Sequence, residues 1–356
     1  MKKVTARKQA FLLVMFTVVA VFSLTGCGQD KKQQDRRNQI PSSEPREDAI
    51  DNAEKPDSGQ EDTSSKEDAS KKDGSTVYMT TDISSDGLMA VYEKLGASPD
   101  GKVAVKLSTG ENGSNYLRTD LIGELVKSLD ATIVECNTAY GGERANTKMH
   151  YQLAKDHGYT EIADVDIMDE DGSMTLPVSD GDNLKENYVG KNFANYNYYV
   201  VLSHFKGHAM AGYGGAIKNI SIGIASSEGK AHIHSGGTGK NMWSGDQDAF
   251  LESMAEAGKS VVDALDGHIL YINVMNRLSV DCDCDGSPAE PDMHDIGILA
   301  SFDPVALDQA CIDLVYDAKD GKLLVKRIES RNGLHTLEQA EKIGLGSRTY
   351  QLERID

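Results

Sequence analysis

The chain lacks a second long hydrophobic run, and most of it is short of positive charge. Beyond the N-terminal segment, no apolar stretch among the 356 residues is long enough to span a bilayer as a helix. The formal net charge is −19, and nearly all of it falls on residues 77–356. An acidic body argues against nucleic acid or anionic lipid as a partner, and it suits solubility or cation binding.

Familiar nucleotide and cluster motifs are also missing. No Gly-Lys-Ser/Thr occurs at the spacing of a phosphate-binding P-loop, and the glycines at 212–215 lack the G-x-G-x-x-G register of a dinucleotide fold. The five cysteines do not form the four-cysteine run of a ferredoxin module. No internal repeat is present. These absences exclude the common nucleotide-binding motifs and weaken an iron–sulfur assignment.

The first 76 residues carry targeting and tether features. A positive segment precedes an apolar run at 10–22 and then Leu24-Thr25-Gly26-Cys27. This order resembles a bacterial lipoprotein signal over 1–26 with Cys27 lipidated, and an ordinary signal peptide is the alternative. Residues 28–76 contain almost no apolar side chains, so 27–76 is predicted to be the anchor cysteine and a disordered tether. We therefore expect an exported protein anchored to the bacterial membrane through Cys27.

Residues 77–356 alternate between strand-like and helix-like patterns, which predicts an α/β fold with a mostly parallel sheet and helices on both faces. Strands are expected at 103–107, 131–135, 162–167, 198–202, 269–274 and 296–300. Helices are expected at 87–95, 120–129, 144–157, 247–265, 304–316 and 336–343. Asp303 and Pro304 are typical of the start of the fifth helix, and Gly158 of the end of the third. The body is one domain or two α/β lobes, with a seam near 164–187.

The segment 203–234 is the best candidate site, because it follows an apolar strand and is dense in glycine. Its glycines allow close approach of the backbone to a ligand: Gly207, Gly212, Gly214 and Gly215. Backbone N–H groups at such a turn, followed by a helix N-terminus, favour an anion. Lys218 would add a positive charge or a nucleophilic amine, with Asn219 beside it as a further binding residue. A glycine-rich turn with a solvated lysine is the alternative.

Four of the nine histidines lie in the same segment. His204 and His208 are four residues apart and would share a face of a helix, whereas His232 and His234 are two apart and would share a face of a strand. Either pair offers imidazole nitrogens to a metal, or an acid and a base, although histidines also serve as structural hydrogen-bonding residues. The spacing alone leaves open which pair takes which role.

The run Asp281-Cys282-Asp283-Cys284-Asp285-Gly286 places two thiols among carboxylates. Cys282 and Cys284 are predicted ligands of a thiophilic metal or of part of an iron–sulfur cluster. Their spacing is not a standard zinc or ferredoxin spacing, so an oxidised pair, a redox site and a plain acidic turn are alternatives. Cys136 and Cys311 lie in strand-like and helix-like runs and are expected to be buried.

Three stretches of the body resemble the bacterial family catalogued as domain of unknown function 362. They are HFKGHAMAGYGGAIKNISIG at 204–223, DCDCDG at 281–286 and DIGILASFDPVALDQACIDLV at 295–315. The tail at 344–352 agrees with them. The resemblance covers nearly the whole body and implies no defined activity. Some members of that family carry iron–sulfur ferredoxin modules, for which this chain lacks the cysteines.

A more distant resemblance points to a mechanism. HAMAGYGGAIK at 208–218 is similar to the motif H-Y-F-A-G-F-x-G-G-x-K of the nickel-pincer lactate racemase family. In that family the lysine carries the cofactor, the preceding histidine is an acid/base residue, and a later histidine binds nickel. The resemblance implies these roles for Lys218, His208 and His234. We therefore assign His208 and Lys218 to catalysis and His234 to metal binding, with the neighbouring His232 as a further candidate metal ligand. The family's second catalytic histidine has no counterpart at 137–142, so we expect a shared fold and loop rather than the shared nickel-pincer cofactor.

Two main classes of function follow. The first is an enzyme, or a degenerate one, with a metal or metallo-cofactor site that moves a proton next to the carboxylate of a small substrate. The second is a non-catalytic surface lipoprotein that binds a small anion or a metal ion. A weaker third hypothesis is an iron–sulfur electron-transfer accessory. The expected partners are the membrane, through the lipid, and a small anionic ligand, but not nucleic acid.

Overall fold

The computed structural model describes residues 74–239, 241–243 and 245–356. The predicted signal peptide, Cys27 and nearly all of the predicted tether lie outside these residues, while the first strand begins at Ser75, just inside the predicted tether. From Gly74 onward the described residues belong to one compact unit. Within these ranges, each helix is too short or too polar to cross a bilayer.

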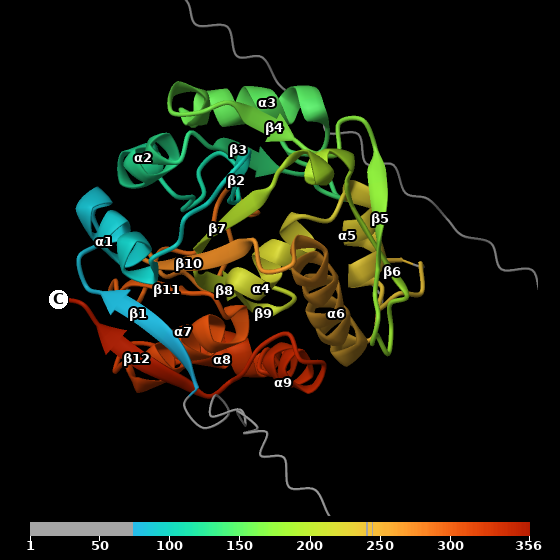
Figure 1. Cartoon of the computed structure of the whole chain (residues 1–356). Coiled ribbons are helices and arrows are strands. Elements are labelled where there is room, and N and C mark those ends of the chain that lie inside the picture. The colour runs from blue at the N-terminus through green and yellow to red at the C-terminus, as the bar shows by residue number, and fades with distance from the viewer. Residues whose placement is uncertain (1–73, 240, 244) are drawn as a thin grey trace, which may run out of the picture. The chain divides into compact units, whose positions relative to one another are not determined.

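The elements alternate along the chain as the sequence predicts (Figure 1). The strands are β1 (Ser75–Thr80), β2 (Val103–Lys106), β3 (Thr132–Glu135), β4 (Val165–Ile167), β5 (Ser173–Pro177), β6 (Glu186–Gly190), β7 (Tyr198–His204), β8 (Lys206–His208), β9 (Gly212–Gly214), β10 (Ile269–Met275), β11 (Gly297–Ser301) and β12 (Tyr350–Arg354). The α-helices are α1 (Ser85–Leu95), α2 (Thr119–Ser128), α3 (Thr147–Asp156), α4 (Ala216–Lys218), α5 (Ser227–His234), α6 (Gln247–Leu265), α7 (Pro304–Asp317), α8 (Lys322–Ser330) and α9 (His335–Lys342). Short 3-10 segments η1 (Tyr159–Glu161) and η2 (Lys191–Asn195) and the π-helical η3 (Asn219–Gly223) complete the described elements.

An eight-stranded sheet lies at the centre, in the order β12-β1-β11-β10-β7-β2-β3-β4. Strand β11 is antiparallel to both of its neighbours, and the other pairings in this sheet are parallel. Two antiparallel pairs, β5–β6 and β8–β9, form separate small sheets. The prediction of an α/β fold with a mostly parallel sheet is therefore confirmed.

Alternate side chains of the central strands enter two different cores. In β7, Val200 and Leu202 pack in the cluster that contains residues of α1 and α2. Tyr199 and Val201 pack in the cluster that contains residues of α4, α6 and α7. Figure 1 shows α1 and α2 on one side of the sheet and α7 on the other. Coverage on both faces explains why β7 is apolar at successive positions.

Local signals set several helix ends. The Asp303 carboxylate accepts hydrogen bonds from the N–H groups of Val305 and Ala306, and Pro304 occupies the first turn of α7. Gly158, with φ of 81°, follows the end of α3. Both ends match the prediction, because capping depends on a few neighbouring residues.

The predicted seam at 164–187 contains β4, β5 and the start of β6. Val178 and Leu184 pack with Phe250 and Leu251 of α6 in one apolar cluster. The segment therefore contributes to a packed core together with α6.

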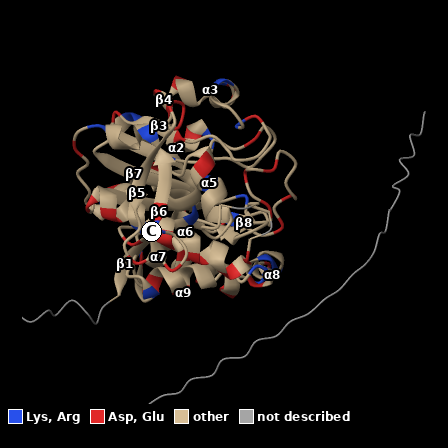
Figure 2. Ribbon diagram, turned by 90° about the vertical axis from the view of Figure 1, so that its right-hand side faces the viewer, with Lys and Arg blue, Asp and Glu red and all other residues tan. Residues whose placement is uncertain are grey.

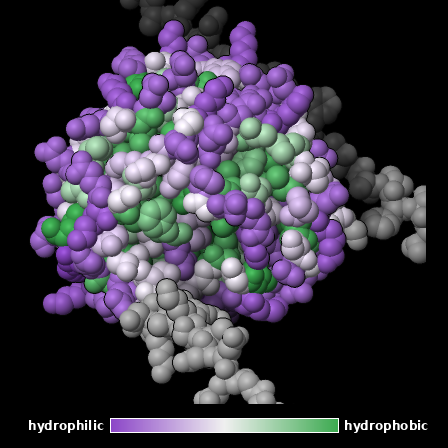
Figure 3. Space-filling model, viewed as in Figure 1, coloured by the Kyte–Doolittle hydropathy of each residue, from purple (hydrophilic) through white to green (hydrophobic). Residues whose placement is uncertain are grey.

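Charge differs between the exterior and the interior of this acidic protein. Figure 2 shows acidic segments (red) along the outer loops and helices. The face in Figure 3 is largely hydrophilic, with apolar patches separated by polar side chains. The interior contrasts with this exterior, because several lysine and arginine side chains are buried around one cavity.

Candidate functional site

A cavity of about 410 Å³ lies at the carboxyl edge of the sheet. The final residues of three neighbouring parallel strands line it, namely Lys106 of β2, Glu135 of β3 and His204 of β7. Parallel strands end at the same edge of a sheet, and ligands of open α/β sheets bind there. The position of the cavity therefore follows from the topology.

His208, Lys218 and His234 line this same cavity, although they come from β8, α4 and α5. The convergence on which the sequence hypothesis depends is thus present in the structure. It arises because the chain leaves β7, forms the β8–β9 hairpin, and returns through α4 and η3 before α5. The expected direct passage from strand through loop to helix is replaced by this hairpin. A π-helical segment such as η3 often occurs at functional sites.

The two histidine pairs are arranged differently from the expectation. His204 and His208 lie on strands, and His232 and His234 lie on the helix α5. On a helix, residues two apart diverge and residues four apart share a face. His234 therefore shares a face with Lys230, and both line the cavity. His232 lies instead beside Tyr188, with ring centroids 5.1 Å apart, so the structure does not bring it to the cavity.

The glycine-rich turn binds a carboxylate of the protein itself. Asp308 of α7 accepts hydrogen bonds from the N–H groups of Ala216, at 2.8 Å, and Ile217, at 3.0 Å. A Cβ atom on Gly215 would lie 2.3 Å from Asp308 Oδ1, which explains the glycine at this position. Burial raises the pKa of Asp308 to about 6. The N–H groups that the sequence offered to an anionic ligand are therefore already occupied.

Of the residues predicted to bind a cofactor through this turn, Gly214, Gly215 and Asn219 line the cavity. Gly207 and Gly212 do not. A Cβ on Gly207 would lie 2.2 Å from the carbonyl oxygen of Val280, and Gly212 takes a φ of 82°. These two glycines permit close packing and a turn, and they position the hairpin rather than contact a ligand in the cavity.

Three side chains, Lys106, Glu135 and Arg144, form what we call the paired wall of the cavity. Lys106 Nζ lies 3.2 Å from Glu135 Oε2, and Arg144 Nη1 lies 3.6 Å from Glu135 Oε1. Arg144 Nε also donates to Glu111 Oε1 at 2.9 Å. Burial alone would raise the pKa of Glu135, but the charges of Lys106, Lys230 and Arg144 outweigh it and lower the pKa to about 2. Each charge of this wall has a partner.

A second buried ion group connects β7 and β8 to the acidic cysteine segment. Asp283 Oδ2 lies 2.8 Å from Lys206 Nζ, and Asp283 Oδ1 lies 3.0 Å from His204 Nδ1. His204 Nε2 donates to the carbonyl oxygen of Asn276 at 2.7 Å. Burial would raise the pKa of Asp283, but His204 and Lys206 hold it well below its usual range. His204 thus has structural partners on both ring nitrogens.

The remaining polar groups form the open wall, which we define as His208, Lys218, Lys230 and His234. Lys230 Nζ donates to the carbonyl oxygen of Ala225 at 2.6 Å, and it forms no ion pair with a carboxylate of the described residues, although its charge acts on Glu135 from a greater distance. Lys218 likewise forms no ion pair with a carboxylate in the part of the chain that the structure describes, although Glu135 opposes the lowering of its pKa from a greater distance. Burial, together with the charges of Lys206 and Arg144, lowers the pKa of Lys218 to about 7. This amine therefore gives up its proton more readily than an ordinary lysine does.

Hydrogen bonds fix different tautomers for the two imidazoles. His208 Nδ1 accepts from the N–H groups of Met210, at 3.2 Å, and Ala211, at 2.9 Å, which places its proton on Nε2. His234 Nδ1 donates to the carbonyl oxygen of Lys230 at 2.7 Å, which leaves a lone pair on Nε2. Burial, with a contribution from Lys218, lowers the pKa of both residues, that of His234 to about 4. Both rings are neutral at pH 7, one as a donor and the other as an acceptor.

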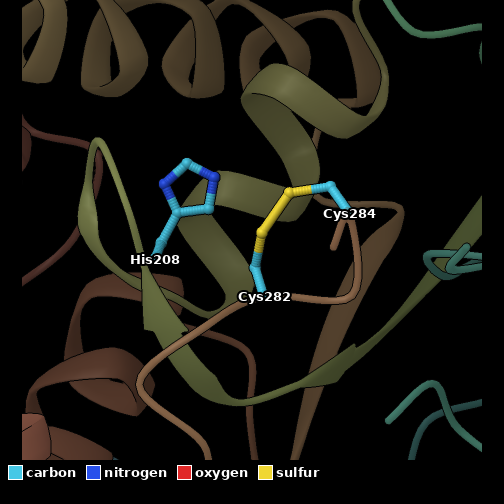
Figure 4. Close-up of side chains that lie close together, drawn as sticks. All are labelled: His208, Cys282 and Cys284. Atoms are coloured by element: carbon cyan, nitrogen blue, oxygen red, sulfur yellow. A yellow bond between two sulfur atoms is a disulfide. The ribbon is translucent and has the colours of Figure 1, made fainter. Parts of the chain in front are cut away.

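Cys282 and Cys284 form a disulfide that lines the cavity beside His208 (Figure 4). Among the described residues, His208, Cys282 and Cys284 are the group with metal-ligand spacing, with their potential ligand atoms within 4.8 Å of one another. Thiolates bind metals, so reduction would have to precede metal binding by this pair. Cys136 and Cys311 are buried, as expected, and they do not line the cavity.

Sequence reasoning missed several residues of the site: Lys106, Glu135, Arg144, Lys206 and Lys230. The sequence contains a signal that could have identified two of these residues. Lys106 and Glu135 are polar residues at the ends of predicted parallel strands, where side chains meet at one edge of the sheet. The others are joined to the site by contacts between distant parts of the chain.

The fold and the cavity define an α/β protein with a cation-rich pocket at the carboxyl edge of its sheet. The chain belongs to the family described as Domain of unknown function (DUF362), whose model matches residues 103–313. No curated protein sequence matches the chain.

The solved structures that are similar to this one include two with low sequence identity. The lactate racemase apoprotein from Thermoanaerobacterium thermosaccharolyticum has 15% sequence identity and a TM-score of 0.42, with 68% of this chain and 57% of that chain covered. A protein from Thermotoga maritima has 13% identity and a TM-score of 0.36, with 72% and 58% covered. The chain spans less than two thirds of the length of either protein.

Proposed function

We propose that the cavity binds a small carboxylate and moves a proton at the carbon next to it. The open wall is the observation that supports this proposal most directly. Lys218 and Lys230 have no carboxylate partner among the described residues, although the protein as a whole is strongly acidic. Lys230 is buried and Lys218 half-buried, and cations withdrawn from water without a carboxylate in contact are unfavourable, so an anionic ligand would supply the missing charge. Hydrogen bonds between ammonium groups and a carboxylate are also stronger than neutral ones.

The two imidazoles supply complementary proton-transfer groups in this proposal. His234 Nε2 carries the lone pair and would accept the proton from carbon. His208 Nε2–H would donate a hydrogen bond to the oxygen on which negative charge develops. Burial and the charge of Lys218 hold the pKa of His234 low in the free protein. A bound carboxylate would offset that charge, so His234 would become a stronger base in the complex.

A metal or metallo-cofactor site is the second candidate, and the lone pair of His234 supports it. A neutral imidazole whose other nitrogen donates to a carbonyl is the usual state of a metal-binding histidine. His234 would hold the metal, Lys218 would hold the organic part of a cofactor, and the bound metal would act as a Lewis acid. The charges of Lys206 and Lys230 disfavour a bare cation and suit an anionic cofactor. The group of His208, Cys282 and Cys284 is also compatible with a metal-related function.

Solvent deuterium exchange tests the proton transfer. Full-length protein is incubated in D₂O with a panel of small 2-hydroxy and 2-amino carboxylates, and NMR follows loss of the proton on the adjacent carbon. We expect exchange with wild type and none with His234→Gln. His232→Gln, on the same helix but outside the cavity, is the matched control and should retain exchange. Binding without exchange for the whole panel would leave the non-catalytic binding protein instead.

Metal analysis of protein from the native host tests the second candidate. We expect a stoichiometric metal in wild type and its loss in His234→Gln, because that variant removes the lone pair on Nε2. An added mass on Lys218 would identify an attached cofactor. Protein without metal and without an adduct would remove this candidate and leave the carboxylate site.

We further propose that the protein is exported and anchored by a lipid on Cys27. The support is the sequence of the first 27 residues, and a disulfide between Cys282 and Cys284 suits an oxidising compartment. In a bacterial host, Cys27→Ala should move the protein from the membrane fraction to the soluble fraction. Mass spectrometry of the mature N-terminus should find acylated Cys27 in wild type, and an unmodified residue would refute the anchor.

A further inference from the structure

The Cys282–Cys284 disulfide is not required to hold its own segment in place. Asp283, between the two cysteines, is bound by His204 and Lys206 at 3.0 and 2.8 Å. Its carbonyl oxygen also accepts a hydrogen bond from the Glu111 N–H at 2.8 Å. A cross-link between residues two apart closes a very short loop, so it restricts the unfolded chain less than a long-range disulfide does. A purely structural role therefore explains this disulfide poorly.

Its position makes the disulfide accessible to a small molecule. Both cysteines line the cavity, with Cys282 buried and Cys284 partly exposed. The other two described cysteines, Cys136 and Cys311, are buried in the core. An incoming thiolate would therefore reach Cys284 Sγ first and release Cys282 as the leaving thiolate.

The cavity also holds groups that stabilise a thiolate. A ring nitrogen of His208 lies within 4.8 Å of both sulfur atoms, and the ring stands beside the disulfide in Figure 4. Because His208 Nδ1 accepts two backbone hydrogen bonds, its Nε2–H is available to a sulfur that becomes negative. Lys218 has no carboxylate partner among the described residues and lines the same cavity. Nearby donors and cations favour the thiolate form and attract anionic reactants.

We propose that Cys282–Cys284 is a redox-active disulfide that exchanges with a small thiol bearing a carboxylate. The first thiolate attacks Cys284 Sγ, forms a mixed disulfide and releases Cys282 as a thiolate. A second thiolate of the same compound attacks the small-molecule sulfur of the mixed disulfide and releases Cys284. Two electrons thus pass from two small thiols to the protein, which becomes the dithiol, while the small thiols become a disulfide. The preference for an anionic thiol rests on the proposed carboxylate site, whereas the reactivity of the disulfide does not.

A pair of thiols with opposite charge tests the proposal. Oxidised full-length protein is treated without oxygen with mercaptoacetate, which has one carboxylate, or with cysteamine, which is cationic. New protein thiols are alkylated and located by mass spectrometry. At equal thiolate concentrations, we expect mercaptoacetate to reduce the disulfide at least about tenfold faster. Alkylation should fall on Cys282 and Cys284, while Cys136 and Cys311 stay unmodified as a check on folding.

Variants test separately the reactivity of the disulfide and its preference for an anionic thiol. Lys218→Met should bring the two rates close together, whereas Lys319→Met, at an exposed turn, should preserve the difference. Cys282→Ser leaves Cys284 without its partner and should form a mixed disulfide with the oxidised dimer of mercaptoacetate. A disulfide that resists both thiols in the folded protein overturns the redox role, and equal rates with both thiols in wild type overturn the preference for an anionic thiol.

Propionate, a carboxylate without a thiol, distinguishes this proposal from the proposed function. Propionate that binds next to an inert disulfide supports the carboxylate site and overturns the redox role. Faster reaction with mercaptoacetate that propionate does not slow supports the redox role and shows that the carboxylate site is elsewhere.

Discussion

The paired wall and the open wall of the cavity contain similar side chains but balance their charges differently. In the paired wall, Lys106 and Arg144 share Glu135, whose pKa is lowered to about 2. In the open wall, Lys218 has no carboxylate partner among the described residues, and its pKa is lowered to about 7. Compensated charges hold a conformation, while an uncompensated amine beside two neutral imidazoles is available to a ligand. The comparison separates residues that build the cavity from residues that act in it.

Glu135→Gln should have the largest effect on stability. It leaves Lys106 and Arg144 buried without the carboxylate that they share, and breaking a buried ion pair costs about 3–5 kcal/mol. Urea unfolding of the full-length protein measures the loss. Lys218→Met removes a cation without a carboxylate partner, so we expect it to change the free energy of unfolding by less than about 1 kcal/mol. Equal losses in the two variants would show that the walls do not differ in this way.

His150 is a buried histidine on whose pKa the charges of the paired wall act. Its titration shows whether this part of the protein tolerates a further buried charge. The side chain is fully buried, its Nε2 lies 2.8 Å from Thr109 Oγ1, and burial, opposed by Glu135 and assisted by Arg144, lowers its pKa to about 3. A histidine of the unfolded chain titrates near 6.5, so the unfolded state binds the proton first as the pH falls. The stability that neutral His150 contributes is therefore present above pH 6.5 and is lost as the pH falls toward 3.

Between pH 7 and pH 4, this one group should account for a loss of about 3 kcal/mol. Unfolding in urea at several pH values, with wild type and His150→Gln, measures that share. The variant should show a shallower loss of stability on acidification. An unchanged slope would indicate that folding does not lower the pKa of His150.

The bounds of several helices follow from local sequence patterns. Helix α6 begins and ends where the apolar periodicity places it, at Gln247 and Leu265, and α7 begins after its predicted cap. Periodicity and capping involve residues within a few turns, so they can be recognised in one sequence. The hairpin β8–β9 and helix α5 were missed, because their glycine-rich and histidine-rich segments lack a clear apolar period.

The site could be anticipated only in part. His208, Lys218 and His234 line one cavity, which the hypothesis of a shared site requires. The N–H groups near Gly215 were interpreted as a ligand cradle, but their partner is Asp308, more than 90 positions later in the chain. Such partners depend on how strands and helices pack, and no local pattern in one sequence specifies them.

Proton uptake during ligand binding tests the open wall most directly. Near pH 8, free Lys218 is mostly neutral, and a bound carboxylate would favour its charged form. Calorimetric titration of the full-length protein with propionate, in buffers of different ionisation enthalpy, should show uptake approaching about one proton per ligand. Lys218→Met should abolish the uptake and weaken binding by about 10- to 100-fold, while Lys319→Met should change neither. Propionate binding without proton uptake, or with the same affinity in Lys218→Met, would contradict the assignment of Lys218 as the unpaired cation that receives the ligand.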